Sequence, residues 1–351
     1  MQTIGWMALA VVGLGAPVPA QPPQVFTGHA EAVLALAFSP DENLIATGDG
    51  AGKIRLWNLN TGELRMTLSG HARGATTIAF SPDGKALASG GYDKKVMLWD
   101  LTTGKPRCVL TGYQSWVRAV CFSPDGTLLA SAGDDSTVRL WDVQAQKEQF
   151  TLRGHKLTVE SIAFSPDGHT LASASRDMTV RLWDVAQGKE TSCLQHQSLV
   201  YALAFRPDGK VLMTGTGPDL SPLKKLAGAT LDDVRKAIEE PGEVRYWDLG
   251  IGKDELSFKI QKGHVSTLTF APGGKLLAVG SAEYYPRNDR AGAIWLLHAT
   301  TGRSIASAEK HTGAITCLAF SPSGKWLASA SNDKTARLWR VEELLGRDRD
   351  K

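Results

Sequence analysis

The sequence predicts an all-β protein built from seven similar four-stranded units, and three observations support this fold class. A tryptophan recurs at a nearly constant interval, which is 42 residues for the first four copies. A phenylalanine followed by a proline turn, as in FSPDG, also occurs seven times. Short apolar runs of strand length, such as VLALAF and KIRLWN, lie between these markers. The seven tryptophans are Trp57, Trp99, Trp141, Trp183, Trp247, Trp295 and Trp339.

Each unit contains the turn chemistry that four antiparallel strands require. In SPDG, proline stands where its fixed φ suits a turn and glycine where φ is positive, so the motif predicts a hairpin. The TGE, TGK and QGK segments after the tryptophans predict a second turn. The last three tryptophan intervals are 64, 48 and 44 residues, which implies insertions of 22, 6 and 2 residues into the basic period.

The repeats resemble the WD-repeat β-propeller. Gly-His pairs begin at Gly28, Gly70 and Gly154, and Trp-Asp pairs end predicted strands. The resemblance extends from Pro22 to Val341 and implies a seven-bladed β-propeller with four antiparallel strands per blade. The last repeat stops after three strands at RLWRV, and QVFTG near the start has the sequence of an outer strand. We therefore expect residues 22–27 to pair with the strand that carries Trp339 and to close the ring.

The expected domain organisation is simple. Residues 1–20 form an expected signal peptide, residues 21–345 the propeller, and residues 346–351 a charged tail. Insertions occupy residues 217–243 in blade 5 and 281–290 in blade 6. The larger insertion contains TLDDVRKAIEE, which predicts one short helix with Thr230 as its N-cap, as a lid on its own blade or as a docking element.

The N-terminal segment predicts export. An apolar stretch from Ile4 to Leu14 precedes small residues around Ala20, as in a secretory signal, and is too short to span a bilayer. Gln2 and Thr3 stand where such signals carry a basic residue. The expected location is periplasmic or extracellular, or cytoplasmic if the segment is not a signal.

Composition narrows the classes of partner. The net charge is only +3, and the chain has no basic tract, so we expect neither nucleic acid nor, after signal removal, a membrane as partner. No histidine or cysteine pair has the spacing of metal ligands, so we expect no metal and no cofactor. A ring of repeats also needs no second copy, so a monomer is expected.

Three units contain a histidine, a serine, an aspartate and a tryptophan at equivalent positions. Catalysis needs one nucleophile, so three copies predict a role shared by the blades. The resemblance implies a buried hydrogen-bonded chain from the aspartate through the histidine and the hydroxyl to the indole. The residues of this structural network are His71, Ser89, Asp93 and Trp99; His155, Ser173, Asp177 and Trp183; and His311, Ser329, Asp333 and Trp339.

Four units depart from this pattern and are expected to be less rigid. The first has Ala51 for the aspartate, the third Tyr113 for the histidine, and the fifth Pro241 for the aspartate. The sixth has Gln261 for the histidine and Val279 for the hydroxyl. His264 lies closer to its phenylalanine than the other histidines do, so it is expected to be a surface residue of a loop.

A partner-binding surface is expected where the repeats differ. Both insertions fall in the same inter-strand turn of consecutive blades, and the smaller one exposes aromatic and basic residues. The family pattern further implies two positions per blade that line the mouth of the ring. The candidate binding residues are Tyr92, Trp116, Arg118, Asp134, Glu160, Arg176, Tyr201, Tyr284, Tyr285, Arg287 and Asn332, with Thr316 at one mouth position.

The sequence therefore favours a non-enzymatic scaffold that binds a protein or peptide on the face with the insertions. The alternative is a hydrolase-like propeller enzyme that uses Glu160 or Asp134 as acid or base and Arg118 or Arg176 to hold an anion. A third possibility is a module of a larger signalling system. Geometry distinguishes the first two: catalytic carboxylates should converge on an open pocket, whereas structural ones should be paired with arginines.

Overall fold

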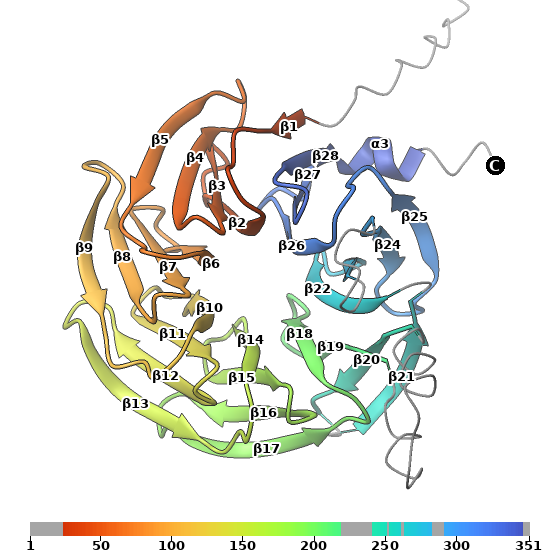
Figure 1. Ribbon diagram of the computed structural model, residues 1–351. Helices are drawn as coiled ribbons and strands as arrows, with labels where there is room; N and C mark the ends of the chain where they lie inside the picture. The colour runs from red at the N-terminus through yellow and green to blue at the C-terminus, as the bar shows by residue number, and fades with distance from the viewer. Residues whose placement is uncertain (1–23, 219–240, 251–252, 261–262, 283–290, 347–351) are drawn as a thin grey trace, which may run out of the picture.

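The computed structural model is a ring of seven four-stranded antiparallel sheets, the blades, around a central axis (Figure 1). It describes residues 24–218, 241–250, 253–260, 263–282 and 291–346. In six blades four consecutive strands form the sheet, with the first strand at the axis and the last strand at the rim; in the seventh, the first strand of the chain supplies the outer strand. The predicted fold class is therefore confirmed.

The strands follow the predicted repeats. Blade 1 contains β2 (Val33–Phe38), β3 (Leu44–Asp49), β4 (Lys53–Asn58) and β5 (Leu64–Ser69); blade 2 contains β6 (Ala75–Phe80), β7 (Ala86–Gly91), β8 (Val96–Asp100) and β9 (Lys105–Leu110); blade 3 contains β10 (Val117–Phe122), β11 (Leu128–Gly133), β12 (Thr137–Asp142) and β13 (Lys147–Arg153). Blade 4 contains β14 (Val159–Phe164), β15 (Thr170–Ser175), β16 (Thr179–Asp184) and β17 (Lys189–Gln195); blade 5 contains β18 (Val200–Phe205), β19 (Val211–Thr216), β20 (Glu243–Asp248) and β21 (Lys253–Lys259). Blade 6 contains β22 (His264–Phe270), β23 (Leu276–Ala282), β24 (Ile294–His298) and β25 (Ser304–Ala308); blade 7 contains β26 (Ile315–Phe320), β27 (Trp326–Ser331), β28 (Ala336–Arg340) and β1 (Gln24–Phe26).

The ring closes between its two ends, as expected. β1 pairs antiparallel with β28, with Gln24 opposite Leu338 and Phe26 opposite Ala336. Phe26 is 1% exposed and packs in the apolar cluster between blades 7 and 1. The strand that starts the described chain thus completes the blade that ends it, and no blade is left with three strands.

The hydrophobic core is divided among the seams between blades. Each of seven apolar clusters combines residues of two neighbouring blades. In one of them, Trp99 of blade 2 packs with Ala46 and Ile54 of blade 1, and all three are at most 1% exposed. Because each blade buries its faces against its neighbours, the ring needs no separate central core.

The structure corrects the tryptophan count in blade 6. Leu297 pairs with Leu277, whereas the equivalent leucines of blades 2 and 7 pair with Trp99 and Trp339. Trp295 lies two residues earlier, opposite Val279, and is 3% exposed in the seam between blades 5 and 6. From Trp247 to Leu297 and on to Trp339 the intervals are 50 and 42 residues, so against a period of 42 blade 6 has an insertion of 8 and blade 7 has none.

Each innermost strand contains a bulge at the same position. In β10 the register shifts between Val117 and Ala119, so Arg118 is the extra residue. The same shift occurs in the first strand of the other six blades. A bulge leaves one residue out of the ladder and turns its side chain. The seven bulge residues are Leu34, Thr76, Arg118, Glu160, Tyr201, Ser266 and Thr316.

The described helix lies at the C-terminal end of the ring. α3 (Val341–Gly346) follows β28 directly and contacts β25 of blade 6, with Val341 and Leu344 buried. The sequence did not predict this helix, and the helix that it did predict, over residues 230–240, lies outside the described residues. Within the described part of the chain, no helix is long and apolar enough to cross a membrane.

The closing strand supports a direct test with two neighbouring substitutions. Phe26→Ala should lower the free energy of unfolding by about 3–5 kcal/mol, because it leaves a cavity in the seam between blades 7 and 1. Val25→Ala changes the adjacent residue, whose side chain is 39% exposed, and should change it by less than about 0.5 kcal/mol. Urea unfolding of both variants measures the difference, and equal losses would contradict the assigned role of β1.

Candidate functional site

The bulge residues converge at the axis of the ring. A cavity of about 210 Å³ there is lined by all seven of them together with Tyr92 and His264. Thr76, Ser266 and Thr316 each donate a hydrogen bond to a backbone carbonyl of the following blade, at 2.6 Å in each case. In blades 2, 6 and 7 the bulge position therefore joins neighbouring blades. In blades 3, 4 and 5 it carries the long side chains of Arg118, Glu160 and Tyr201.

Two ion pairs organise the long side chains. Arg118 donates from Nε to one oxygen of Asp134 at 2.7 Å and from Nη2 to the other at 3.1 Å. Arg176 donates from Nε to Glu160 in blade 4. Each pair joins a bulge residue to the turn between the second and third strands of its own blade. Asp134 and Glu160 are thus both paired with arginines.

Aromatic rings extend each ion pair along the mouth of the ring. The rings of Tyr92 and Trp116 lie 4.5 Å apart between centroids, and the Arg118 guanidinium lies 5.7 Å and 5.1 Å from them. On the other side, Arg176 lies 5.8 Å from the ring of Tyr201, which lies 4.8 Å from the ring of His264. We call these eight residues the mouth row; it runs through blades 2 to 6 and consists of Tyr92, Trp116, Arg118, Asp134, Glu160, Arg176, Tyr201 and His264.

Small residues make room for the mouth row. A side chain at Gly74 would place its Cβ 2.5 Å from the ring of Tyr92. A Cβ at Gly133 would lie 2.0 Å from the carbonyl oxygen of Trp116, which accepts the amide of Asp134 at 2.9 Å. Both glycines therefore hold the aromatic part of the row close to the backbone of its blades.

Burial and neighbouring charges shift the pKa of two members of the row, Arg118 and His264. Burial opposes the charge of Arg118, but the hydrogen bonds to Asp134 and the charge of Glu160 outweigh it and raise the pKa of the guanidinium. Burial and the charge of Arg176 lower the pKa of His264 to about 4, so its imidazole is neutral near pH 7. The expectation that His264 is a surface loop residue is wrong: it begins β22 and lines the axial cavity.

The remaining candidates lie apart from the mouth row. Asn332 lies in the turn between β27 and β28, where its amide donates to the carbonyl of Ala314, and it does not line the axial cavity. Tyr284, Tyr285 and Arg287 lie outside the described residues. Sequence reasoning missed His264 as a member of the row, because its position six residues before Phe270 did not reveal that it begins the innermost strand.

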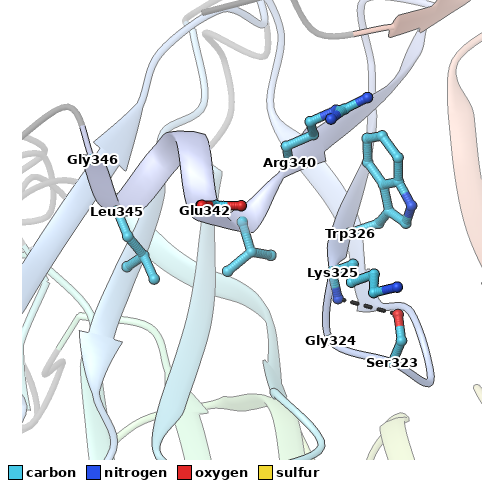
Figure 2. A pocket seen from close by; sticks show the side chains of 9 residues that line it. Ser323, Gly324, Lys325, Trp326, Arg340, Glu342, Leu345 and Gly346 are labelled. Atoms are coloured by element: carbon cyan, nitrogen blue, oxygen red, sulfur yellow. Dashed lines mark hydrogen bonds between the residues drawn. The ribbon is translucent and has the colours of Figure 1, made fainter. Parts of the chain in front are cut away.

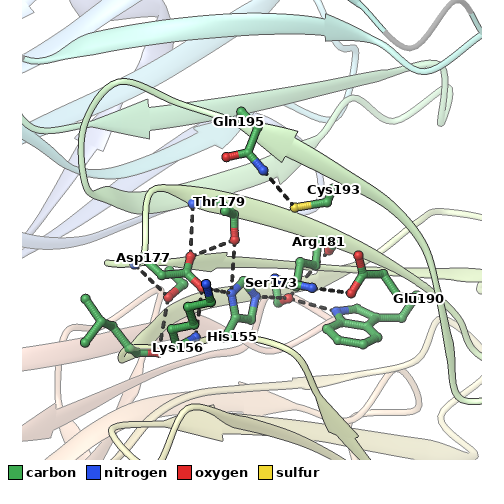
Figure 3. A network of polar contacts seen from close by, with 12 residues as sticks. His155, Lys156, Ser173, Asp177, Thr179, Arg181, Glu190, Cys193 and Gln195 are labelled. Atoms are coloured by element: carbon green, nitrogen blue, oxygen red, sulfur yellow. Dashed lines mark hydrogen bonds and ion pairs between the residues drawn. The ribbon is translucent and has the colours of Figure 1, made fainter. Parts of the chain in front are cut away.

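Figure 3 shows the polar network of blade 4. Nδ1 of His155 lies 2.9 Å from the Asp177 carboxylate, and Nε2 lies 2.7 Å from Oγ of Ser173. The Trp183 indole donates to the same Oγ at 2.8 Å. An indole N–H can only donate, so Oγ of Ser173 accepts from Trp183. These contacts link the carboxylate, the imidazole, the hydroxyl and the indole in one chain.

The same contacts occur in blades 2 and 7. His71 lies 2.9 Å from Asp93 and 2.7 Å from Ser89, to which Trp99 donates at 2.7 Å. The corresponding distances for His311, Asp333, Ser329 and Trp339 are 2.8 Å, 2.7 Å and 2.9 Å. All three serines are buried, so the network lies inside the blades and not at the mouth.

Blades 1, 3 and 5 keep parts of the network with other residues. Blade 1 has Ala51 at the position of the aspartate, but it still contains a carboxylate. Asp49, two residues earlier in the chain, lies 3.0 Å from Nδ1 of His29. In blade 3, the Tyr113 hydroxyl contacts Oγ of Ser131 at 2.5 Å, and Trp141 donates to the same oxygen at 3.0 Å.

In blade 5, His196 and Trp247 both contact Thr214, at 2.9 Å and 3.1 Å. Blade 6 has Val279 at the hydroxyl position, opposite Trp295, and this part of its seam is apolar. The hydrogen-bonded chain is therefore replaced by hydrophobic packing in that blade.

A second hollow, of about 730 Å³, lies beside α3 (Figure 2). The turn from Ser323 to Lys325, Trp326 and residues of α3 line it, and the Arg340 guanidinium lies 5.1 Å from the Trp326 ring. This hollow also has an arginine, an aromatic ring and a carboxylate, that of Glu342, but its lining comes from blade 7 and α3 alone, whereas the mouth row extends through five blades. The described residues also contain no group of three potential metal ligands.

Comparisons with known proteins agree with this architecture. The profile of the WDR36/Utp21 second beta-propeller domain matches residues 22–221, which is more than half of the chain. The profile of the WD domain, G-beta repeat, matches residues 256–284 and 302–340. The fold and these matches define a WD-repeat propeller, a class of protein-interaction scaffold. The chain belongs to the WD-repeat β-propeller family.

Individual relatives match over short stretches. SEC12-like protein 2 of Arabidopsis thaliana is 33% identical over 30% of this chain and 25% of its own length. WD repeat and SOCS box-containing protein 1 of Xenopus tropicalis is 40% identical over 29% of this chain and 23% of its own length. Transducin beta-like protein 2 of Homo sapiens is 42% identical over 14% of this chain and 12% of its own length. The chain thus spans a quarter or less of each of these relatives.

The blade 4 network predicts a pH-dependent stability. Burial would raise the pKa of Asp177, but hydrogen bonds from His155, Thr179 and the Lys156 amide hold it well below its usual range. A depressed folded-state pKa stabilises the protein above the unfolded value of about 3.9, and this stability is lost as the pH falls below it. Asp177→Asn should therefore cost about 1–3 kcal/mol at pH 7, and less at pH 3.

Urea unfolding at the two pH values measures this difference. The matched control is Asp135→Asn in blade 3, where Tyr113 replaces the histidine and no imidazole contacts the aspartate in the described residues. A loss for Asp177→Asn that is the same at both pH values would contradict the proposed role of its charge.

Proposed function

We propose that this propeller is a non-enzymatic scaffold that binds a protein or peptide on the face that carries the mouth row. The observation that supports this proposal most directly is that the row extends through five blades beside one axial cavity. Tyrosine, tryptophan and arginine, which dominate binding energy in protein interfaces, make up five of its eight members. Trp116 is 39% exposed, so a partner can bury part of its ring.

The electrostatics of the row favour a polypeptide over a polyanion. Arg118 and Arg176 contribute two positive charges and Asp134 and Glu160 two negative charges, so the paired groups sum to zero. Both pairs are partly buried, with side-chain exposures between 12% and 42%. Fixed, paired charges beside aromatic rings suit recognition of a folded or extended polypeptide by shape and hydrogen bonding.

The described strand ends that flank the two insertions lie on the face of the mouth row. The strand ends that flank them, Thr216 and Glu243 in blade 5 and Ala282 and Ile294 in blade 6, belong to the turns between second and third strands, as do Tyr92, Asp134 and Arg176. Tyr284, Tyr285 and Arg287 in the smaller insertion are proposed to add contacts to a partner that is seated on the row.

The geometry supports the scaffold over the rival enzyme. A hydrolase would need Asp134 or Glu160 as an available acid or base near an open pocket. Asp134 instead accepts two hydrogen bonds from Arg118, and Glu160 accepts one from Arg176. These contacts occupy the carboxylate oxygens that an acid or base would need for a substrate.

Paired affinity captures from an extract of the native host test the binding surface. The variant with both Trp116→Ala and Tyr201→Ala should recover at least tenfold less of any partner that wild type recovers, because both aromatic anchors are removed. Val109→Ala, at a 41% exposed position of the outer strand β9, is the matched control and should recover as much as wild type. Equal recovery by all three proteins would contradict the assignment of the face.

The insertion is tested separately with Tyr284→Ala, Tyr285→Ala and Arg287→Ala combined. A smaller loss than for the row variant is expected if these residues only add to the contact. Recovery that falls as far as in the row variant would place the main contact on the insertion instead.

We also propose that residues 1–20 direct export of the propeller. The support is the apolar stretch from Ile4 to Leu14, followed by small residues up to Ala20. Mass spectrometry of the protein purified from its native host should give a chain that begins at Gln21. A chain that retains residues 1–20 in the cytoplasm would contradict export.

A further inference from the structure

On the face opposite the mouth row, hairpins join the first and second strands of the blades. Most of these hairpins contain an aspartate whose carboxylate accepts a hydrogen bond from a backbone amide of the same hairpin. In five blades an aspartate in this hairpin accepts the backbone amide of the residue two positions later. The donors and acceptors are Asn43 and Asp41, Lys85 and Asp83, Thr127 and Asp125, His169 and Asp167, and Lys210 and Asp208, at 3.0–3.1 Å. In blade 7, Lys325 donates instead to Oγ of Ser323 at 3.3 Å.

Blade 6 alone lacks this oxygen. Its hairpin reads Pro272, Gly273, Gly274, so a glycine stands at the position of the aspartate. The amide of Lys275, which corresponds to the five donors, has no acceptor among the described residues. A Cβ at Gly273 would meet nothing within 4 Å, so the space of the missing carboxylate is open. The blade 6 hairpin therefore keeps the amide that donates the hydrogen bond but lacks the carboxylate that accepts it in the other blades.

Two neighbouring positions carry basic residues where other blades have a serine or an aspartate. A cavity of about 790 Å³ between the hairpins of blades 5 and 6 is lined by Gly273, Lys275, Arg206 and His298. Arg206 replaces the serine found in other hairpins, and its Cγ would lie 3.3 Å from a Cβ at Gly274. His298 ends β24, where Asp100, Asp142, Asp184 and Asp248 end the third strands of four other blades.

Of the charged side chains that line the cavity, one cation has no anionic partner within the cavity and can interact with a ligand. Arg206 donates from Nε to both oxygens of Asp208, at 3.0 Å and 2.9 Å, so these two charges cancel. Lys275 is exposed at the rim and contributes one positive charge. The Nδ1 of His298 is buried and has no hydrogen-bond partner among the described residues. A single negative charge thus balances the site.

We propose that this cavity, the blade 6 anion site, binds the side-chain carboxylate of an aspartate or glutamate from an acidic peptide. The carboxylate occupies the space that Asp41, Asp83, Asp125, Asp167 and Asp208 fill in their own hairpins, and it accepts the Lys275 amide. The five internal examples are all carboxylates, and the net charge of +1 matches a carboxylate better than a phosphate dianion. The site faces away from the mouth row and is independent of the proposed scaffold surface.

Backbone NMR of the full chain tests the site. In ¹⁵N-labelled protein, the probe acetyl-Gly-Asp-Gly-amide should shift the Lys275 amide resonance with saturation. The neutral, isosteric acetyl-Gly-Asn-Gly-amide should bind at least tenfold more weakly. The Lys85 amide serves as an internal control because Asp83 already occupies it, and it should not shift. Equal shifts from both peptides, or no shift at Lys275, would overturn the proposal.

Gly273→Asp restores the hairpin of the other blades and provides the decisive variant. The backbone of Gly273 does not have a positive φ, so an aspartate fits without strain. The new side chain should move the Lys275 amide resonance in the absence of probe and weaken probe binding at least tenfold. Unchanged probe affinity in a folded variant would refute the site. Saturation by inorganic phosphate at a lower concentration than by the aspartate probe would overturn the choice of a carboxylate.

Discussion

The antiparallel pairing of β1 with β28 is the interaction on which the rest of the ring depends. A sheet edge without a partner exposes backbone donors and acceptors, and a propeller avoids this at its last blade only if the two ends of the chain meet. Here three residues make the ladder, and Phe26 fills the seam behind it. Two further contacts cross that seam: Thr316 donates to the carbonyl of Val33 at 2.6 Å, and Lys334 to that of Ala30 at 2.8 Å. Closure at one seam holds all the others in contact.

Closure also explains why the candidate site lies at the axis. Every innermost strand has the same bulge, so a closed ring brings seven bulge side chains to one place. Where that side chain is a small hydroxyl, it bonds the next blade and strengthens the ring. Where it is long, in blades 3, 4 and 5, it cannot make that short contact and reaches instead to neighbours around the mouth. The same backbone device therefore serves structure in one half of the ring and a surface in the other.

The interior network shows how much residue type can vary while the contact persists. Tyr113 reaches Ser131 with a phenol in place of an imidazole, and Asp49 reaches His29 from a different position in the turn. In both cases the substituted group contacts the same hydroxyl or ring nitrogen as in the complete networks. The contact, and not the residue type, stabilises the blade. Blade 6 instead replaces the polar chain with Val279 and Trp295, which pack without needing hydrogen-bond partners for a hydroxyl.

The sequence by itself determined the seven units, the turns and the fourth strand of the last blade, because these follow from local periodicity and turn chemistry repeated along the chain. The resemblance to the WD-repeat family implied the three complete networks and the mouth positions of Arg118, Glu160 and Tyr201. Three features were decided only by the tertiary structure. Leu297, and not Trp295, occupies the repeat position of the tryptophan; Asp49 supplies the carboxylate that Ala51 lacks; and His264 belongs to the mouth row. Each of these depends on strand register or on contacts between blades, and a linear count cannot distinguish an inserted residue from a substituted one.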